Sequence, residues 1–274
     1  MKLRFLTIIA ALLAFASLDA DAQSMRPGRP GRPGRPGRPG NAHSGADAFR
    51  GIGLTFGYVN SNYRTLDLAT DETATSGLLH GFTIGLTKDF SLLPHALYFQ
   101  TGLNYYYQND PRNENCKIPL TDMSVRLVGD WEEHHIGIPL RLKYDLHLLD
   151  RLGLTFDAGP TLLMGLSSKY QYKTKLADSV LAVDYNLYNQ KITASGTSSS
   201  FDLEDWMAKS DMYPEGRLGR FDVMLGASVG AHFFHVLEVR VGYDWGLINR
   251  YRKDIADLYS MHRGQFTLSA GIRF

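Results

Sequence analysis

Apolar and polar residues alternate along the last stretch of the chain, residues 264–274. The apolar positions are Phe266, Leu268, Ala270, Ile272 and Phe274, and small or polar residues lie between them. Successive side chains of a β-strand point to opposite faces, so this pattern predicts a strand with one apolar and one polar face. About ten residues is the length of a tilted strand that crosses a membrane.

Seven earlier segments have the same alternation and predict strands of the same kind. They are residues 51–60, 80–89, 96–107, 132–145, 152–166, 219–233 and 236–247. Together with the last segment they give an even number of strands, which an up-and-down barrel with both chain ends on one side requires.

The connections between these segments alternate in length. The long ones are 61–79, 108–131, 167–218 and 248–263, and the short ones centre on 90–95, 147–151 and 234–235. Barrels of bacterial outer membranes have short turns on the periplasmic side and long loops outside, and a sheet in lipid must close because an open edge leaves amide groups unpaired. We therefore predict an all-β fold: a closed antiparallel up-and-down transmembrane β-barrel of eight strands, with short periplasmic turns and long extracellular loops.

Ten strands are the alternative, because residues 168–175 and 180–189 also alternate. Lys169, Lys173 and Lys175 cluster on the first of these segments, and no turn signal separates it from Leu166. We therefore expect a hairpin that rises above the membrane from the third long loop. Residues 202–209 predict a short helix with Asp202 as its N-cap.

The N-terminal residues differ from the rest of the chain. Residues 1–22 predict a secretory signal peptide, with Lys2 and Arg4 before an apolar core and the cleavage pattern Ala20-Asp21-Ala22. Residues 23–48 contain five Arg-Pro-Gly units and predict an extended periplasmic linker without a core. The expected domains are therefore the signal peptide (1–22), the linker (23–48) and an outer membrane β-barrel domain (49–274).

Composition and charge restrict the function further. The formal net charge is +1, the first 22 residues sum to zero and the repeat carries five arginines, so residues 41–274 carry about −4. A slightly acidic domain does not favour nucleic-acid binding. The single cysteine, Cys116, excludes an intrachain disulfide.

Three segments resemble a known family. They are Ile136-Gly137-Ile138-Pro139-Leu140-Arg141-Leu142-Lys143-Tyr144, Ala158-Gly159-Pro160-Thr161-Leu162-Leu163-Met164 and Phe221-Asp222-Val223-Met224-Leu225-Gly226-Ala227-Ser228-Val229-Gly230. In these motifs the chain resembles the PorT-like outer membrane β-barrel family of Bacteroidetes. The resemblance implies an eight-stranded barrel and does not fix a function, although the founding member is linked to protein secretion across the outer membrane.

Two prolines lie inside predicted strands, Pro139 and Pro160. Proline cannot donate a ladder hydrogen bond and is normally excluded from central strands. We therefore expect a bulge or a local bend at each of them.

Charged residues alternate with the apolar faces and should point into the barrel. They are Arg141, Lys143, Asp157, Asp222, Glu238, Arg240, Asp244 and Arg273. An eight-stranded barrel is just wide enough for side chains to fill it, and buried charges are costly unless paired. We predict a salt-bridge network that fills the lumen, with a narrow solute channel as the alternative.

Two groups of residues could carry chemistry instead. Residues near the predicted outer rim could serve an outer membrane lipid or protein hydrolase: Glu132, Glu133, His134, His135, Ser168 and His262. Histidines near the short turns could bind a metal or respond to pH: His95, His147, His232 and His235. No motif orders the first group, and histidines at turns are common, so we expect no enzyme, no cofactor and no metal.

The expected function is therefore that of a non-enzymatic outer membrane protein whose loops act in interaction, adhesion or envelope and secretion assembly. Its expected partners are outer membrane lipids, the barrel assembly machinery, and an extracellular or periplasmic protein. Phe274 ends the chain on an aromatic residue. We expect it to be the C-terminal insertion signal that the assembly machinery recognises.

Overall fold

The computed structural model describes residues 51–93, 96–117, 124–149, 151–176, 179–195, 218–234, 236–252 and 256–274. Residues Ile52–Arg273 form one compact unit, and the fold below is that of this unit. In the other unit, the backbone amide of Gly51 donates to the carbonyl oxygen of Phe274 at 2.5 Å. The predicted signal peptide, the linker and the helix at 202–209 lie outside the described residues.

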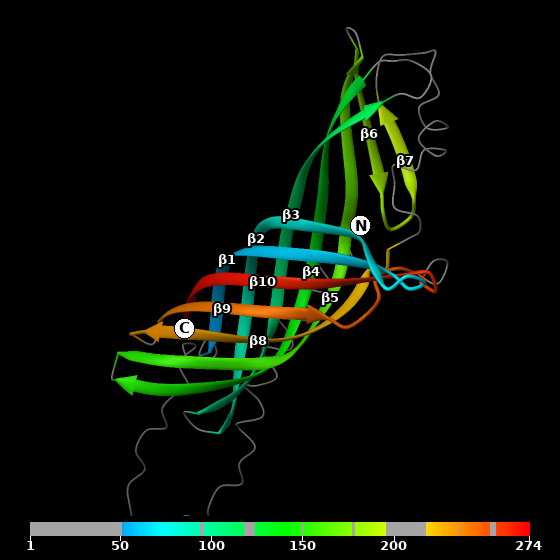
Figure 1. The fold of residues 1–274 in the computed structure, drawn as a ribbon. Helices are drawn as coiled ribbons and strands as arrows, with labels where there is room; N and C mark the ends of the chain where they lie inside the picture. Colours follow the sequence, from blue (N-terminus) through cyan, green and yellow to red (C-terminus); the bar gives the residue numbers. More distant parts are fainter. Residues whose placement is uncertain are drawn as a thin grey trace, which may run out of the picture. The chain divides into compact units, whose positions relative to one another are not determined.

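The described residues of this unit form strands and no helix (Figure 1). The strands are β1 (Ile52–Asp67), β2 (Glu72–Leu93), β3 (Leu97–Lys117), β4 (Ser124–Leu149), β5 (Leu152–Leu176), β6 (Ser179–Asn186), β7 (Lys191–Ser195), β8 (Phe221–Phe233), β9 (Leu237–Gly246) and β10 (Tyr259–Arg273). Among the residues described, no helix is long and apolar enough to cross a membrane.

Eight of the strands close into a ring. Each strand from β1 to β5 pairs with the next, β5 pairs with β8, and β8, β9 and β10 follow until β10 pairs with β1. All of these pairings are antiparallel. The prediction of eight strands in the ring is therefore confirmed, and β6 and β7 extend the sheet from β5 as a hairpin outside the ring.

The ring has two ends. We call the end where β2–β3, β4–β5 and β8–β9 are joined the turn end, and the opposite end the loop end. The prediction of a long loop at 61–79 was wrong, because β1 and β2 run on and only residues 68–71 connect them. Likewise β3 and β4 continue through most of 108–131 as a paired ladder. The sequence pattern did not predict these extensions, because both faces of the strands are polar there. The strands still form, because backbone hydrogen bonds between strands do not require an apolar face.

The strands separate into two groups above the ring at the loop end. The pairing of β2 with β3 reaches His80 and Asn109, and that of β5 with β8 reaches Met164 and Phe221. Beyond those pairs, β3, β4 and β5 continue together and are extended by β6 and β7 (Figure 1). We call this part, residues 110–117, 124–131 and 168–195, the extended sheet.

A bulge in β5 controls which side chains face inward. The register against β4 shifts by one residue between the pairs His134–Ser167 and His135–Gly165. Inward positions of β5 are therefore odd-numbered up to Gly165, and even-numbered Ser168 and Tyr170 are buried beyond it. The register is continuous across Pro139 and across Pro160, so neither proline lies at a bulge, and the alternative of a local bend stays a prediction. Gly159, next to Pro160, has a φ of 151°.

The ring reverses the usual distribution of polarity. Its inner face carries buried polar and charged residues, and its outer face carries exposed apolar ones. The outer face includes Leu54, Phe56, Phe82, Ile84, Leu86, Leu142, Phe156, Leu162, Leu225, Val229, Val239, Val241, Trp245, Phe266, Leu268 and Ile272. Soluble monomers rarely expose a contiguous apolar area larger than several hundred Å².

Candidate functional site

The interior of the ring holds three successive groups of polar side chains. Toward the turn end lies an ion-pair cluster around Lys143, in the middle lies a small cavity beside Arg141, and toward the loop end lies a cluster around Glu133. Strand alternation places all three groups inside, since the same strands present their apolar residues outside.

Lys143 is at the centre of the turn-end cluster. Its Nζ lies 3.3 Å from Oδ2 of Asp89 and 3.1 Å from Oε1 of Glu238, and its side chain is fully buried. Arg240 reaches the same Glu238 oxygen at 2.7 Å, while Arg273 contacts Asp89 at 2.8 Å. The opposite charges therefore alternate, which offsets the cost of removing them from water.

The middle group surrounds a cavity of about 70 Å³. Arg141 contacts Oδ1 of Asp157 at 3.3 Å, hydrogen-bonds Thr161 at 3.0 Å and forms an ion pair with Asp244. Arg240 also reaches Asp157, at 3.4 Å. A cavity of this size holds only a few water molecules.

Seven of the eight charged residues predicted to face the lumen lie in these two groups. The eighth, Asp222, is buried closer to the loop end, and none of the ion pairs found among the described residues includes it. Sequence reasoning missed Asp89 and Asp145, which complete the turn-end cluster. The signal was present, because both residues occupy the same alternating positions as the other inward residues of their strands.

Glu133 is at the centre of the loop-end cluster and is fully buried. Its two oxygens contact Arg250 at 3.2 Å and Arg263 at 2.5 Å, and Tyr63 donates a hydrogen bond to it. Both guanidinium groups also lie over the Tyr63 ring, at 5.0 and 4.9 Å from its centre. One carboxylate therefore contacts two buried cations from distant parts of the chain, and its single negative charge balances only one of their two positive charges.

The structure brings together three of the residues considered for a hydrolase. Ser168 donates to Glu133 at 2.8 Å, and Nε2 of His135 lies 3.5 Å from the same carboxylate. The acid therefore lies between serine and histidine, whereas a nucleophilic triad needs the histidine in the middle. All three side chains are buried.

The other hydrolase candidates lie apart from that cluster. His134 contacts Glu132 at 2.9 Å and Tyr105 at 2.6 Å, and His262 contacts Ser260 at 2.9 Å. These side chains are partly exposed and alternate with the inward positions of their strands.

An aromatic group lies above the loop-end cluster. The rings of Tyr63, Trp131 and Tyr170 follow one another at centre distances of 4.9 and 5.2 Å, and all three are buried. Tyr188, beyond β6, packs against Gly165, and Arg220 lies 4.9 Å above its ring. Burial raises the pKa of Tyr188, so its phenol stays protonated. Apolar side chains thus point inward in this part, as in a soluble protein.

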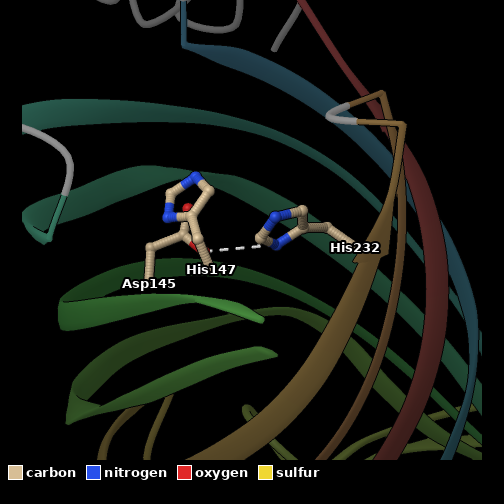
Figure 2. A group of neighbouring side chains, drawn as sticks. All are labelled: Asp145, His147 and His232. Atoms are coloured by element: carbon tan, nitrogen blue, oxygen red, sulfur yellow. Dashed lines mark ion pairs between the residues drawn. The ribbon is translucent and has the colours of Figure 1, made fainter. Parts of the chain in front are cut away.

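Of the four histidines predicted near the turns, the structure brings two together. His147 and His232 lie with Asp145 at the turn end (Figure 2), and their ring centres are 5.6 Å apart. His95 and His235 lie outside the described residues.

Comparison with solved structures found similar chains of low sequence identity. The attachment invasion locus protein Ail of Yersinia pestis is 10% identical, with a TM-score of 0.37 and coverage of 82% of this chain and 99% of that one. Neisserial surface protein A is 11% identical (TM-score 0.35; 82% and 97% covered), and the outer membrane protease OmpT of Escherichia coli is 11% identical (0.32; 81% and 96%).

A comparison with curated protein sequences gave no match. The sequence profile of a family described as outer membrane protein beta-barrel domain matches residues 42–252, which is more than half of the chain. The polar interior and apolar exterior of the ring agree with that description. The chain therefore belongs to the outer membrane protein β-barrel domain family.

Proposed function

We propose that the protein spans the outer membrane as a filled, non-enzymatic barrel and acts through the extended sheet at its loop end. The observation that carries this proposal is the apolar exterior of the ring, combined with a charged interior that is paired across the lumen. An exterior of this kind is stable in lipid and unstable in water.

The proposal places the turn end in the periplasm and the loop end outside the cell. Connections of two or three residues, as between β4 and β5 and between β8 and β9, suit the periplasmic side. The expected partners on that side are the membrane lipids and the barrel assembly machinery.

The extended sheet supports a role in interaction. Tyr170, Tyr185, Leu187 and Tyr188 give it a buried apolar side. Tyr188 packs against Gly165 of β5, and this contact holds the extended sheet to the ring. A rigid sheet that projects from a membrane barrel offers backbone edges and side chains to a protein partner. Adhesion and secretion assembly of the PorT-like kind both fit such a surface.

A crosslinking pull-down from intact cells tests the role of the extended sheet. Replacing residues 177–195 with a short Gly-Ser linker removes the hairpin and leaves the ring strands unchanged. We expect the crosslinked partner of the wild-type protein to be lost while the amount of barrel in the outer membrane is unchanged. Equal recovery of the same partner with both proteins would contradict this role.

Phe274 is proposed as the signal for insertion. Its deletion should lower the amount of protein in the outer membrane fraction more than it lowers synthesis, because an assembly machinery that reads the C-terminal aromatic residue would lose its target. The measurement is quantitative blotting of membrane and soluble fractions, with Phe274→Tyr as the control. Normal insertion of the truncated chain would refute the role of Phe274 as the signal. Recovery of the wild-type protein in the soluble periplasm would refute the membrane location itself.

A further inference from the structure

Three potential metal ligands converge at the turn end of the ring, where Asp145 forms the edge of the ion-pair cluster around Lys143. One imidazole nitrogen of His147, one of His232 and a carboxylate oxygen of Asp145 lie within 4.8 Å of one another (Figure 2). The residues come from two strands, β4 and β8, which are separated in the ring by β5.

The register of the strands explains this convergence. His147 pairs with Gly153 of β5, and Gly153 pairs with His232 of β8, so the two histidines lie in one row on either side of a glycine. Asp145 lies two residues before His147 and therefore on the same face of β4. A Cβ atom at Gly153 would lie 2.1 Å from Cε1 of His232. The glycine thus provides the space in which the imidazole lies over β5.

The two carboxylate oxygens of Asp145 contact different residues. Oδ2 contacts Arg273 at 3.4 Å, and Oδ1 lies 3.2 Å from Nδ1 of His232. Oδ1 is buried, and no donor among the described residues hydrogen-bonds it. Two ligands of a tetrahedral zinc ion lie about 3.3 Å apart when each bond is about 2.0 Å, so the spacing of these two atoms already suits a shared ion.

We propose that Asp145, His147 and His232 form a binding site for a divalent transition metal ion of the zinc type. Two imidazoles and one carboxylate are a donor set that selects such ions over Mg²⁺ and Ca²⁺, which prefer oxygen ligands. His147 is exposed, so an ion enters from the turn end, and Arg273 retains the second oxygen of Asp145. The bound ion links β4 to β8 across β5 and stabilises this end of the ring.

Cobalt titration tests the site. The full-length mature chain is refolded in detergent, and a chelator removes any bound metal. The protein is then titrated with Co²⁺, because the visible absorption of bound Co²⁺ reports nitrogen and oxygen ligands at low coordination number. Zn²⁺ is added last, in competition with Co²⁺. We expect one equivalent to bind, Zn²⁺ to displace it and Mg²⁺ to have no effect. His147→Gln should weaken binding by about tenfold or more, since even loss of a group behind a ligand costs ten- to a hundredfold.

Two further variants test whether binding depends on these three ligands and on their arrangement. His80→Gln removes a histidine of the outer face that contacts Tyr58 at 2.5 Å and should bind as the wild type does. Gly153→Ala keeps all three ligands but displaces the His232 ring and should also weaken binding. In the wild type, Zn²⁺ should raise the temperature at which the folded gel band is lost, and in His147→Gln it should not. No saturable Co²⁺ absorption, equal binding by His147→Gln, or an equal loss in His80→Gln would overturn the proposal.

Discussion

At the scale of single residues, the ring depends on a few charges that are shared between distant segments. Glu133 is the clearest case, because its carboxylate is the counter-charge of both Arg250 and Arg263. All three side chains are at most 2% exposed. Removing one partner of a buried ion pair leaves the other charge without compensation.

Glu133→Gln should therefore lower the free energy of unfolding by about 3–5 kcal/mol, the usual cost of breaking a buried pair. The measurement is urea-induced unfolding of the protein in lipid vesicles, followed by tryptophan fluorescence. Glu132→Gln is the control, because that side chain is 28% exposed and contacts only partly exposed neighbours; its effect should stay within about 1 kcal/mol. Equal losses in the two variants would refute the central role of Glu133.

At the scale of elements, the one-residue bulge in β5 decides how the ring continues into the extended sheet. Without the shift between Gly165 and Ser167, Lys169 would face inward in place of Ser168 and Tyr170. With it, Ser168 reaches Glu133, and the Tyr170 ring packs against Trp131 in a tilted contact. The bulge thus changes the inward side chains from those of a barrel lumen to those of a packed core.

Gly165 lies at the same place and receives Tyr188 from the segment between β6 and β7. A Cβ atom on Gly165 would lie 1.8 Å from the Tyr188 hydroxyl, which is too close for any contact. We expect Gly165→Ala to displace Tyr188 and loosen the hairpin. Trypsin should then cleave faster after the lysines between residues 169 and 191, while the heat-dependent gel mobility of the ring stays unchanged.

Gly219→Ala is the control for that prediction, because its nearest neighbour would be 3.4 Å from the added carbon, an ordinary contact. Unchanged cleavage in Gly165→Ala would show that Tyr188 does not hold the hairpin. Faster cleavage in both variants would point to a general loss of stability instead.

At the scale of the unit from Ile52 to Arg273, the ring closes between β1 and β10, from Gly53–Arg273 to Asp67–Tyr259. Closure leaves every strand of the ring with two neighbours, as lipid requires. Inside, the ion pairs around Lys143, the cavity of about 70 Å³ and the cluster around Glu133 follow one another along the lumen.

A lumen filled in this way should not conduct ions. In planar bilayers, the refolded protein should give no steady open level, and an open porin in the same bilayers provides the positive reference. The physical reason is that an ion would have to displace paired, buried charges at both ends of the cavity. A stable open level of uniform size would favour the narrow solute channel instead.

The sequence by itself determined the strands, their number in the ring and the side on which most charges lie. Period-two alternation fixes the face of each residue wherever one face is apolar, so Leu268 and Arg240 could be assigned without coordinates. The same alternation failed at 61–67 and 72–79, where polar residues occupy both faces and only the backbone ladder defines the strand.

Only the tertiary structure decided which inward residues meet. Pairing across strands depends on register, and register depends on features that alternation does not reveal, such as the bulge before Ser168. Ring closure then brings Arg263 of β10 to Glu133 of β4, and His232 of β8 to Asp145 of β4. The charged residues of the lumen could be predicted from the sequence. Their partners and the proposed metal site depend on how the strands are aligned around the ring.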